Sequence, residues 1–466
     1  MTLEKGNKKT IRGWIFYDWA NSVYNLVISS AIFPIFYDTV TTNEFLKNYN
    51  REHGLKLEEV PEGVNVVVDF FGTQLSPSVL MSFTLSFSFL IVSILSPMLS
   101  GVADLTGSKK KFMKFFCYLG AFSCISLYWF GQAPLEVGML SVFLASIGFW
   151  NSLVFYNAFL PEIAAPEDHD RISASGYTMG YLGSMLLLIV CLGIVMGIGK
   201  EYTNVSFILV GIWWIGFSQI TYRVLPNNVY NRPKSSKVLM NGFRELKKVL
   251  KEFGTQPKLK RFLNAFFFFN TGVQTVMLMA VLYAKREIFT GKYEDQATTG
   301  LIVAILLIQL LGALGAFLLS RISTVVGNVQ SLLIVVAVWI PLCVSAYFLK
   351  TPVGFYILAA GVGLVMGGTQ ALSRSTYSKF LPETEDHASY FSFYDVTEKV
   401  GIVFGTFFFG LMEYLTNDMR SSILSVIFFF AMGWLLLLFV PRDRMRRNPD
   451  YDEKLTTDNQ TLDYFK

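Results

Sequence analysis

The chain has 466 residues, of which 53% are hydrophobic and 16% are charged, and its formal net charge is +5. A soluble protein of average composition carries about 25% charged residues, so this composition excludes an ordinary soluble domain. Runs of about 20 apolar residues cross a bilayer as helices, whereas barrel strands are about half that length. The sequence therefore predicts an all-α integral membrane protein.

Twelve apolar runs are predicted to cross the membrane. Each must satisfy its own backbone hydrogen bonds, because lipid offers no partners. The runs lie near residues 14–38, 79–100, 112–131, 136–160, 173–198, 205–224, 261–283, 298–319, 329–349, 353–377, 390–414 and 421–440. We therefore predict an N-terminal six-helix bundle at 1–224, a linker at 225–260, a C-terminal six-helix bundle at 261–440 and a tail at 441–466.

A phrase at the end of the fourth span returns in the tenth. Ser152-Leu-Val-Phe-Tyr-Asn-Ala-Phe-Leu-Pro-Glu162 and Ser373-Arg-Ser-Thr-Tyr-Ser-Lys-Phe-Leu-Pro-Glu383 share six of eleven residues. Chance recurrence of Leu-Pro-Glu is the simpler alternative, but both copies end an apolar run. Such a repeat is typical of transporters built from two similar halves. We therefore expect two pseudo-symmetric bundles related by an axis along the membrane normal, with Tyr156 and Tyr377 in equivalent places.

The basic residues predict the orientation of the chain. With the N-terminus inside the cell, roughly 29 of the 39 Lys and Arg residues lie on the cytoplasmic side and about 9 lie outside. We expect both termini in the cytoplasm and the protein in the cell (inner) membrane. The basic N-terminal segment has no small-residue cleavage site, so we expect an uncleaved first helix. The positive net charge then reflects topology and implies no nucleic-acid partner.

Two connections are longer than the others. Residues 39–78 are predicted to form an outside loop rich in Glu, whose role is open. The linker at 225–260 contains apolar positions at helical spacing, which are Leu239, Phe243, Leu246, Leu250 and Phe253. The opposite face is basic, and such an amphipathic helix suits the anionic surface of the cytoplasmic leaflet.

The loop after the second span carries a recognisable motif. Its sequence, Gly101-Val-Ala-Asp104-Leu-Thr-Gly107 followed by lysines at 109–111, resembles the signature loop of the major facilitator superfamily. The two glycines allow a tight turn between close helices, and Asp104 can cap or salt-bridge a neighbouring helix. The corresponding loop of the second half, at 320–328, is degenerate.

Several further strings resemble the vacuole-effluxer family of the major facilitator superfamily, in its bacterial type. They are Tyr17-Asp-Trp-Ala-Asn-Ser22, Leu160-Pro-Glu162, Arg171-Ile-Ser-Ala-Ser-Gly176, Phe269-Asn-Thr-Gly-Val-Gln-Thr275, Ser373-Arg-Ser375, Leu381-Pro-Glu383 and Phe391-Ser-Phe-Tyr-Asp395. The resemblance runs from about residue 11 to 440 and implies a twelve-helix transporter. The family includes fungal vacuolar exporters of amino acids and bacterial proteins of unassigned substrate. Relatives often carry Asp where this chain has Thr271, so an acid-dependent coupling role at that position is not carried over.

Polar side chains inside the spans fall on helical stripes. A polar face in contact with lipid is unfavourable, so these stripes must line an aqueous cavity or bond to another helix; for Ser and Thr, bonding between helices is the simpler interpretation. The substrate or coupling candidates are Asp18, Asn21, Asn25, Tyr156, Asn270, Gln274, Gln370, Arg374, Tyr377, Asp395 and Glu398.

Ionisable residues within spans are expensive and therefore informative. Asp18 is either a proton carrier or substrate-ammonium partner, or else a gate salt bridge or helix N-cap. Asp395 and Lys399 are four residues apart, which favours a local ion pair and leaves Glu398 as the unpaired acid. Arg374 could pair with Asp395 or receive a substrate carboxylate.

Two acids at matched loop positions, Glu162 and Glu383, are expected to brace the gate on the cytoplasmic side rather than touch the solute. All three histidines, His53, His169 and His387, fall in predicted loops. We therefore expect no buried imidazole to act as a proton relay.

The function predicted from these features is secondary active transport of a small polar solute by a monomer, without a cofactor. Amino acids, moved outward, are favoured, and sugars or small drugs remain alternatives; symport and antiport are both open. Our hypothesis for coupling is a proton bound by Asp18, with Asn21 and Gln274 orienting the solute. A membrane enzyme acting on a lipid-linked substrate is the alternative class, but no metal motif, nucleophile elbow or Walker loop supports it. The four cysteines lie within predicted spans and fit neither a zinc site nor a disulfide framework.

Overall fold

The computed structural model of the protein describes residues 5–61, 64–227, 238–416 and 418–442. Within these residues twelve helical segments are long and apolar enough to cross a membrane, which confirms the predicted number. The part of the predicted linker at 228–237 and of the predicted tail at 443–466 lies outside the described residues.

The main helices of the first half are α1 (Lys8–Val23), α2 (Ile32–His53), α3 (Pro77–Thr106), α4 (Lys109–Ser126), α5 (Leu135–Asn157), α7 (His169–Gly197) and α8 (Val205–Val224). Those of the second half are α10 (Pro257–Glu287), α11 (Ala297–Val326), α12 (Asn328–Phe348), α13 (Pro352–Phe380), α14 (His387–Thr416) and α15 (Ile423–Leu438). Short elements between them are the π-helix η1 (Tyr24–Ala31), the single turn α6 (Leu160–Ile163) and the linker helix α9 (Val238–Gly254). The predicted boundaries at 224 and 261 stay predictions, although α8 ends at Val224 and α10 begins at Pro257.

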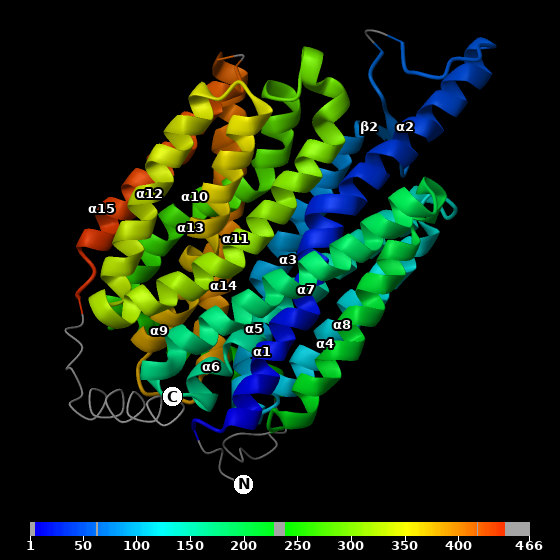
Figure 1. The fold of residues 1–466 in the computed structure, drawn as a ribbon. Helices are drawn as coiled ribbons and strands as arrows, with labels where there is room; N and C mark the ends of the chain where they lie inside the picture. The colour runs from blue at the N-terminus through cyan, green and yellow to red at the C-terminus, as the bar shows by residue number, and fades with distance from the viewer. Residues whose placement is uncertain (1–4, 62–63, 228–237, 417, 443–466) are drawn as a thin grey trace, which may run out of the picture.

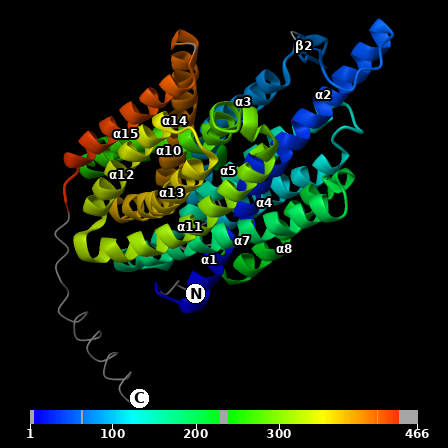
Figure 2. The same ribbon diagram turned by 45° about the horizontal axis from the view of Figure 1, so that its top comes forward.

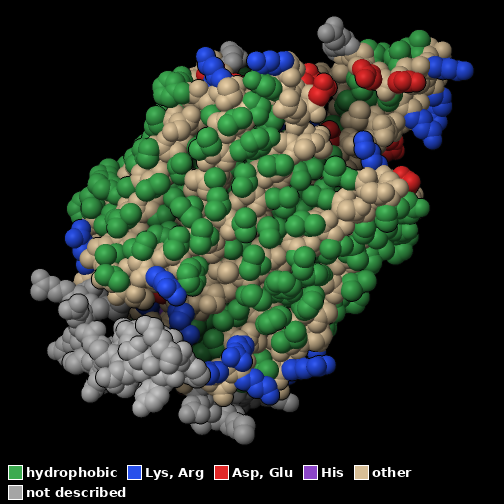
Figure 3. Space-filling view, viewed as in Figure 1, with side chains coloured by type: hydrophobic (Ala, Val, Ile, Leu, Met, Phe, Trp, Pro, Cys, Tyr) green, Lys and Arg blue, Asp and Glu red, His purple; other side chains and the backbone are tan. Residues whose placement is uncertain are grey.

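The two halves of the chain form two bundles that lie side by side (Figures 1 and 2). They meet along three pairs of long helices: α7 packs on both α11 and α13, and α3 packs on α14. Hydrophobic side chains cover the middle of the face in Figure 3, whereas Lys and Arg side chains gather toward its ends. An apolar belt between charged ends is what a bilayer requires of a spanning protein. The end that holds α6, α9 and the turn between α3 and α4 is called the basic end below.

The repeated phrase occupies matching places in the two bundles. Tyr156 lies near the end of α5 and Tyr377 near the end of α13, and both are fully buried. The Leu-Pro-Glu turns that follow lie at the same end of the molecule, because Lys109 Nζ contacts Glu162 of the first turn and lies 3.5 Å from the carbonyl oxygen of Glu385, just after the second. This is the arrangement expected of halves related by an axis along the membrane normal.

Small residues allow the closest helix contact in the C-terminal bundle, between α11 and α13. A Cβ atom at Gly315 would overlap the carbonyl group of Leu364, and one at Gly367 would overlap the carbonyl group of Gly312. Small residues at such crossings let two backbones approach, which is the main source of packing energy between helices in lipid.

Much of the segment at 39–78, predicted as an outside loop, has regular structure. Helix α2 continues the first span as far as His53, where Gly54 in the left-handed conformation ends it. A short antiparallel hairpin of β1 (Val68–Phe70) and β2 (Thr73–Leu75) then leads into α3. Thr39, Thr41 and neighbouring polar residues bond within the helix, so the polar composition that suggested a loop is compatible with a helix that leaves the bilayer.

The amphipathic helix predicted in the linker is present as α9, but part of its apolar face contacts protein. The Val249 side chain is fully buried, and α9 packs on α3. Phe253 lies against Phe393 at 5.8 Å between ring centroids. The side chains of Leu239 and Phe243 lie outside the described residues.

Candidate functional site

A polar cavity lies between the two bundles and contains about 1040 Å³ of space not filled by protein atoms. Side chains from α1, η1, α5, α7, α10, α11, α13 and α14 line it. Nine of the eleven predicted candidates are among them: Asp18, Asn21, Asn25, Asn270, Gln274, Gln370, Arg374, Asp395 and Glu398. The other two, Tyr156 and Tyr377, are buried in their own bundles and do not line the cavity.

Seven of the 22 residues that line the cavity carry amide side chains. Besides the five predicted from the sequence, Asn157 and Gln309 contribute amides that sequence reasoning missed. Each amide offers both donors and acceptors, so together they can surround a solute of mixed polarity. Asn157 belongs to the repeated phrase, and that was the signal available for it; Gln309, within a long apolar run, offered none.

A π-helical segment carries Asn25 to the cavity wall. The first span changes from α1 to the π-helix η1 at Tyr24 and returns to α-helix at Ile32. Ser30 Oγ donates a 2.9 Å hydrogen bond to the carbonyl oxygen of Asn25, which the wider helix leaves accessible. Such segments in long helices are frequent at functional sites, and no periodicity in the sequence had indicated this one.

An ion pair joins the bundles at one side of the cavity. Arg374 Nη2 of α13 donates to Asp18 Oδ2 of α1 at 3.1 Å, and the two side chains are 2% and 7% exposed. Tyr156 donates its hydroxyl proton to the same oxygen at 2.8 Å. The guanidinium also donates to Ser173 Oγ and O at 2.9 and 2.8 Å, and to Asn157 Oδ1 at 3.4 Å. A residue of one bundle is therefore held almost wholly by groups of the other.

Aromatic rings complete the surroundings of Arg374. Its guanidinium carbon lies 4.2 Å from the ring centre of Tyr177 and 4.9 Å from that of Trp14, within cation–π range. The predicted alternative in which Arg374 pairs with Asp395 is wrong, because the latter lies on a separate cluster. Asp18 takes the salt-bridge role; the cap of α1 is Asn7 instead.

A second charged cluster lies on α14. The predicted ion pair of Lys399 and Asp395 is present at 2.9 Å. Glu398 is not the unpaired acid expected, since it accepts a 2.6 Å hydrogen bond from Gln274 Nε2 and lies 3.3 Å from Lys399 Nζ. The lysine ammonium also lies 3.5 Å from the ring centre of Trp150 on α5, so this cluster too bridges the bundles. Trp150 was not singled out from the sequence, because an aromatic residue in an apolar span has no distinguishing pattern.

The signature loop at the basic end caps a helix of the opposite bundle, as predicted. Asp104 accepts hydrogen bonds from the backbone N–H groups of Ala388 and Ser389, at 3.1 and 2.7 Å, at the start of α14. Lys109 lies 3.2 Å from Asp104 and also pairs with Glu162. A carboxylate at a helix N-terminus is stabilised by the free N–H groups and the helix dipole.

The other residues expected at this end follow the prediction only in part. Gly107, at φ +63°, ends α3 in the left-handed turn, whereas Gly101 lies inside the helix. Glu383 is exposed, so it does not match the buried Glu162. The prediction that all three histidines lie in loops is wrong, because His169 and His387 are the first residues of α7 and α14 and His53 is the last residue of α2. His169 and His387 are also buried, contrary to the expectation that no imidazole is.

A further cluster, not predicted from the sequence, joins the two bundles at the position that corresponds to the Asp104 cap in the other half. Asp170 at the start of α7 accepts hydrogen bonds from Lys379 Nζ at 2.6 Å, Asn328 Nδ2 at 2.6 Å and Ser323 Oγ at 3.0 Å. Two of these partners lie in the loop judged degenerate. The second-half loop thus bonds to α7 as the first-half loop bonds to α14, with the carboxylate supplied by the other bundle.

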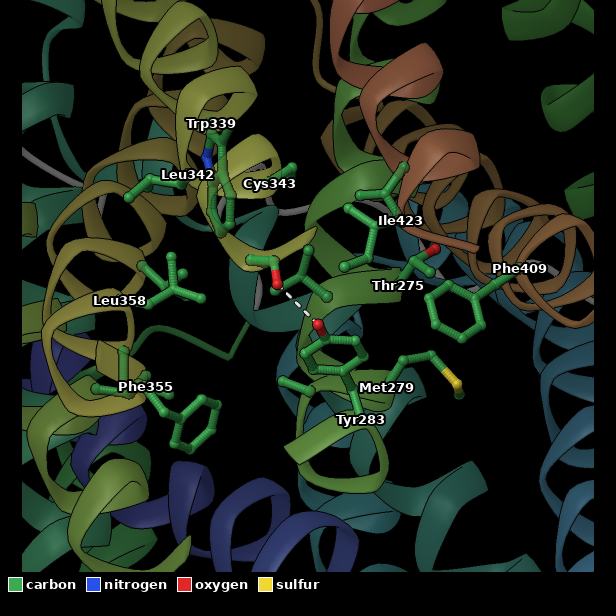
Figure 4. A pocket seen from close by; sticks show the side chains of 17 residues that line it. Thr275, Met279, Tyr283, Trp339, Leu342, Cys343, Phe355, Leu358, Phe409 and Ile423 are labelled. Atoms are coloured by element: carbon green, nitrogen blue, oxygen red, sulfur yellow. Dashed lines mark hydrogen bonds between the residues drawn. The ribbon is translucent and has the colours of Figure 1, made fainter. Parts of the chain in front are cut away.

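A second cavity lies inside the C-terminal bundle, mainly between α10, α12, α13 and α15 (Figure 4). It contains about 690 Å³ of space not filled by protein atoms. The described residues that line it carry no charge, and Trp339 and Cys343 are typical of them. Its two hydroxyl groups already have partners: Tyr283 donates to the carbonyl oxygen of Ala346 and Thr275 to a backbone oxygen of its own helix, each at 2.7 Å. This cavity does not suit a polar solute.

Comparison with known proteins shows the family. Residues 6–450 match the family described as Vacuole effluxer Atg22 like. The chain belongs to this family. It is 27% identical to the uncharacterized MFS-type transporter YxiO of Bacillus subtilis (strain 168), over 93% of this chain and 95% of the relative. It is 22% identical to Autophagy-related protein 22-1 of Penicillium rubens, over 94% of this chain and 91% of that protein.

Solved structures confirm the fold. The major facilitator transporter FucP in the outward conformation aligns with a TM-score of 0.63 at 12% identity, covering 94% of this chain and 99% of that chain. The human organic anion transporter MFSD10 aligns with a TM-score of 0.64 at 11% identity, over 93% and 100% of the two chains. The family match and its transporter relatives make the protein a multi-pass membrane transporter rather than an enzyme, and the solved structures show the major facilitator fold. Among the described residues no group of three or more His, Cys, Asp and Glu side chains could hold a metal ion.

Proposed function

We propose that this protein is a secondary active transporter that exports small zwitterionic solutes, amino acids in particular, by alternating access. The observation that carries the proposal is the amide-lined cavity between the two bundles, with charged groups from both halves on its wall. A site built from a few placed polar groups among apolar ones suits one small, oriented solute.

The charges on the wall favour a solute with a cationic group. Arg374 is already occupied by Asp18 and the serine at 173, so it is poorly placed to receive a substrate carboxylate in this conformation. Glu398 faces the cavity with a side chain that is 17% exposed. An ammonium group near that carboxylate, with the solute carboxylate among amides such as Asn21 and Gln370, would match both ends of an amino acid.

The contacts between bundles support alternating access. In this conformation the ion pair of Asp18 and Arg374, the cap formed by Asp104 and the cluster around Asp170 all join the two halves. Rocking the bundles apart at the basic end requires all three to break, which would expose the cavity there. We infer that Asp18 acts first as part of this gate, and that any effect on proton coupling follows from the gate.

We further infer that the basic end faces the cytoplasm and that the protein works as a monomer in the cell membrane. The argument is the excess of Lys and Arg that the sequence places on that side.

The test is counterflow in proteoliposomes made with the full-length protein. Vesicles are loaded with an unlabelled mixture of amino acids, and uptake of the same radiolabelled amino acids is followed against protein-free vesicles. The expected result is transient accumulation that depends on the internal load. Counterflow of sugars alone, in vesicles loaded with a sugar mixture, would contradict the proposed substrate class. So would the absence of counterflow with either load.

A further inference from the structure

The cavity holds more negative than positive charge. Its charged lining residues, in the described part of the chain, are three carboxylates and one guanidinium. Asp18 is paired with Arg374 at 3.1 Å, and Asp395 is paired with Lys399 at 2.9 Å. Glu398 is the third carboxylate and must share Lys399, at 3.3 Å, with Asp395. When all three acids are ionised, this group of residues carries one uncompensated negative charge within the membrane.

The geometry shows which acid carries that charge. The Asp395 side chain is 8% exposed and its second oxygen lies 3.3 Å from Ser96 Oγ, so both of its oxygens are engaged within the protein. Both oxygens of Glu398 are also engaged, by Lys399 at 3.3 Å and by the Gln274 amide at 2.6 Å, but its side chain is 17% exposed and is the more accessible of the two. The carboxylate that a proton or a solute can reach from the cavity is therefore Glu398.

The groups around Glu398 come from several helices. The titratable or charged ones that share the cluster or the cavity with it are Asp18 of α1, Tyr177 and Tyr181 of α7, Arg374 of α13, and Tyr394, Asp395 and Lys399 of α14. On the sides of α3, α5 and α10, the partners of the cluster are uncharged: Ser96, Trp150 and Gln274. Since both cations already have a closer acid, an intramembrane carboxylate in this place is stable only with a cation bound or with a proton bound.

We propose, building on the transport function above, that Glu398 is an exchange site that binds either one proton or the ammonium group of the solute. When the ammonium group arrives, the Glu398 carboxyl releases its proton to water in the cavity. When the solute leaves, one proton returns to the same oxygen, so the Glu398 carboxylate is compensated by one positive charge in both states, while the carboxylate of the zwitterion adds one negative charge to the cavity when the solute is bound. One proton thus enters for each solute exported, and the substrates are solutes that bear an amine.

The wild-type protein provides the first measurement. The probe is the amino acid with the fastest counterflow, compared with its 2-hydroxy acid, which replaces the ammonium group by a hydroxyl. In weakly buffered detergent solution, binding of the amino acid should release up to about one proton per protein, and its affinity should fall about tenfold per pH unit where Glu398 is protonated. The 2-hydroxy acid should bind much more weakly and release none. An affinity for the amino acid that does not change with pH would overturn the proposal without any variant.

The variants assign the proton to one residue. Titrated from alkaline to acid pH in the absence of solute, Glu398→Gln should take up about one proton fewer than wild type, and it should release none on binding. Glu398→Asp should keep the exchange. Glu413→Gln is the matched control, since Glu413 lies on the same helix, pairs with Arg286 at 2.8 Å and is outside the cavity. Equal proton uptake by wild type and Glu398→Gln would overturn the assignment.

The two proposals fail in different ways. If no amino acid shows counterflow, the proposed substrate class fails, while the titration without solute still decides whether Glu398 binds the proton. If counterflow is present but no proton is released, the transport function stands and the exchange site is wrong.

Discussion

The ion pair between Asp18 and Arg374 makes the sharpest prediction about conformation. Asp18→Asn keeps the shape of the side chain but leaves the buried guanidinium without a counterion. Removing one partner of a buried ion pair is destabilising by about 3–5 kcal/mol. The contacts of Arg374 with Ser173 and the aromatic rings remain, so we expect the lower limit, about 3 kcal/mol, or roughly a hundredfold in an equilibrium constant. Only the conformation in which the bundles are closed at the basic end loses this energy, because Asp18 and Arg374 are in contact in that conformation.

The variant should therefore shift the population toward a form that is open at the basic end. Spin labels at Arg12→Cys on α1 and Glu383→Cys after α13, both exposed positions, report the separation of the two bundles by pulsed electron paramagnetic resonance. The four native cysteines, which are free and buried, are replaced first. Asp168→Asn is the control, because this acid pairs with Arg171 at an exposed site where an ion pair contributes about 1 kcal/mol or less.

The expected result is a longer distance distribution in Asp18→Asn than in wild type and Asp168→Asn. The double variant Asp18→Asn/Arg374→Gln should recover part of the short distance, since it buries no unpaired charge. Identical distributions in wild type and Asp18→Asn would refute the view that this pair holds the basic end closed. Normal proton-driven transport by the same variant would further show that Asp18 is not the coupling carboxylate.

Three further experiments test an ion pair, a helix contact and the orientation of the chain. Glu162→Gln should lower the melting temperature, because it leaves the buried Lys109 with Asp104 as its remaining acid, at a loss below about 3 kcal/mol; an unchanged melting curve would contradict that. Gly367→Leu should prevent close packing of α13 on α11 and reduce the yield of monodisperse protein, whereas wild-type yield would show that the contact tolerates a side chain. In whole cells, Leu55→Cys should react with an impermeant maleimide and Arg244→Cys should not; the reverse pattern would invert the proposed orientation.

Much of the fold followed from local properties of the chain. A bilayer imposes a minimum apolar length on each helix, so the number of spans could be read from composition alone. Helix geometry places residues four apart on one face, which is why the pair of Asp395 and Lys399 was predictable. Asp104 was expected to cap or salt-bridge a neighbouring helix, and it caps α14. The same reasoning misjudged 39–78, because polarity shows where a helix leaves lipid and not where it ends.

The pairings between helices were decided only by the tertiary structure. Asp18 and Arg374 are 356 positions apart, and the sequence offered Asp395 as an equally good partner. Which of them meets the guanidinium depends on how α1, α13 and α14 are rotated about their axes. Likewise, Glu398 was expected to be unpaired, yet Gln274 of another helix donates a hydrogen bond to it. Two histidines that were predicted to lie in loops are buried at the first positions of helices. Hydrophobic length and periodicity determine that a helix spans the bilayer and which face is polar; the rotation and depth that bring two polar faces together are set by side-chain packing across the bundle interface.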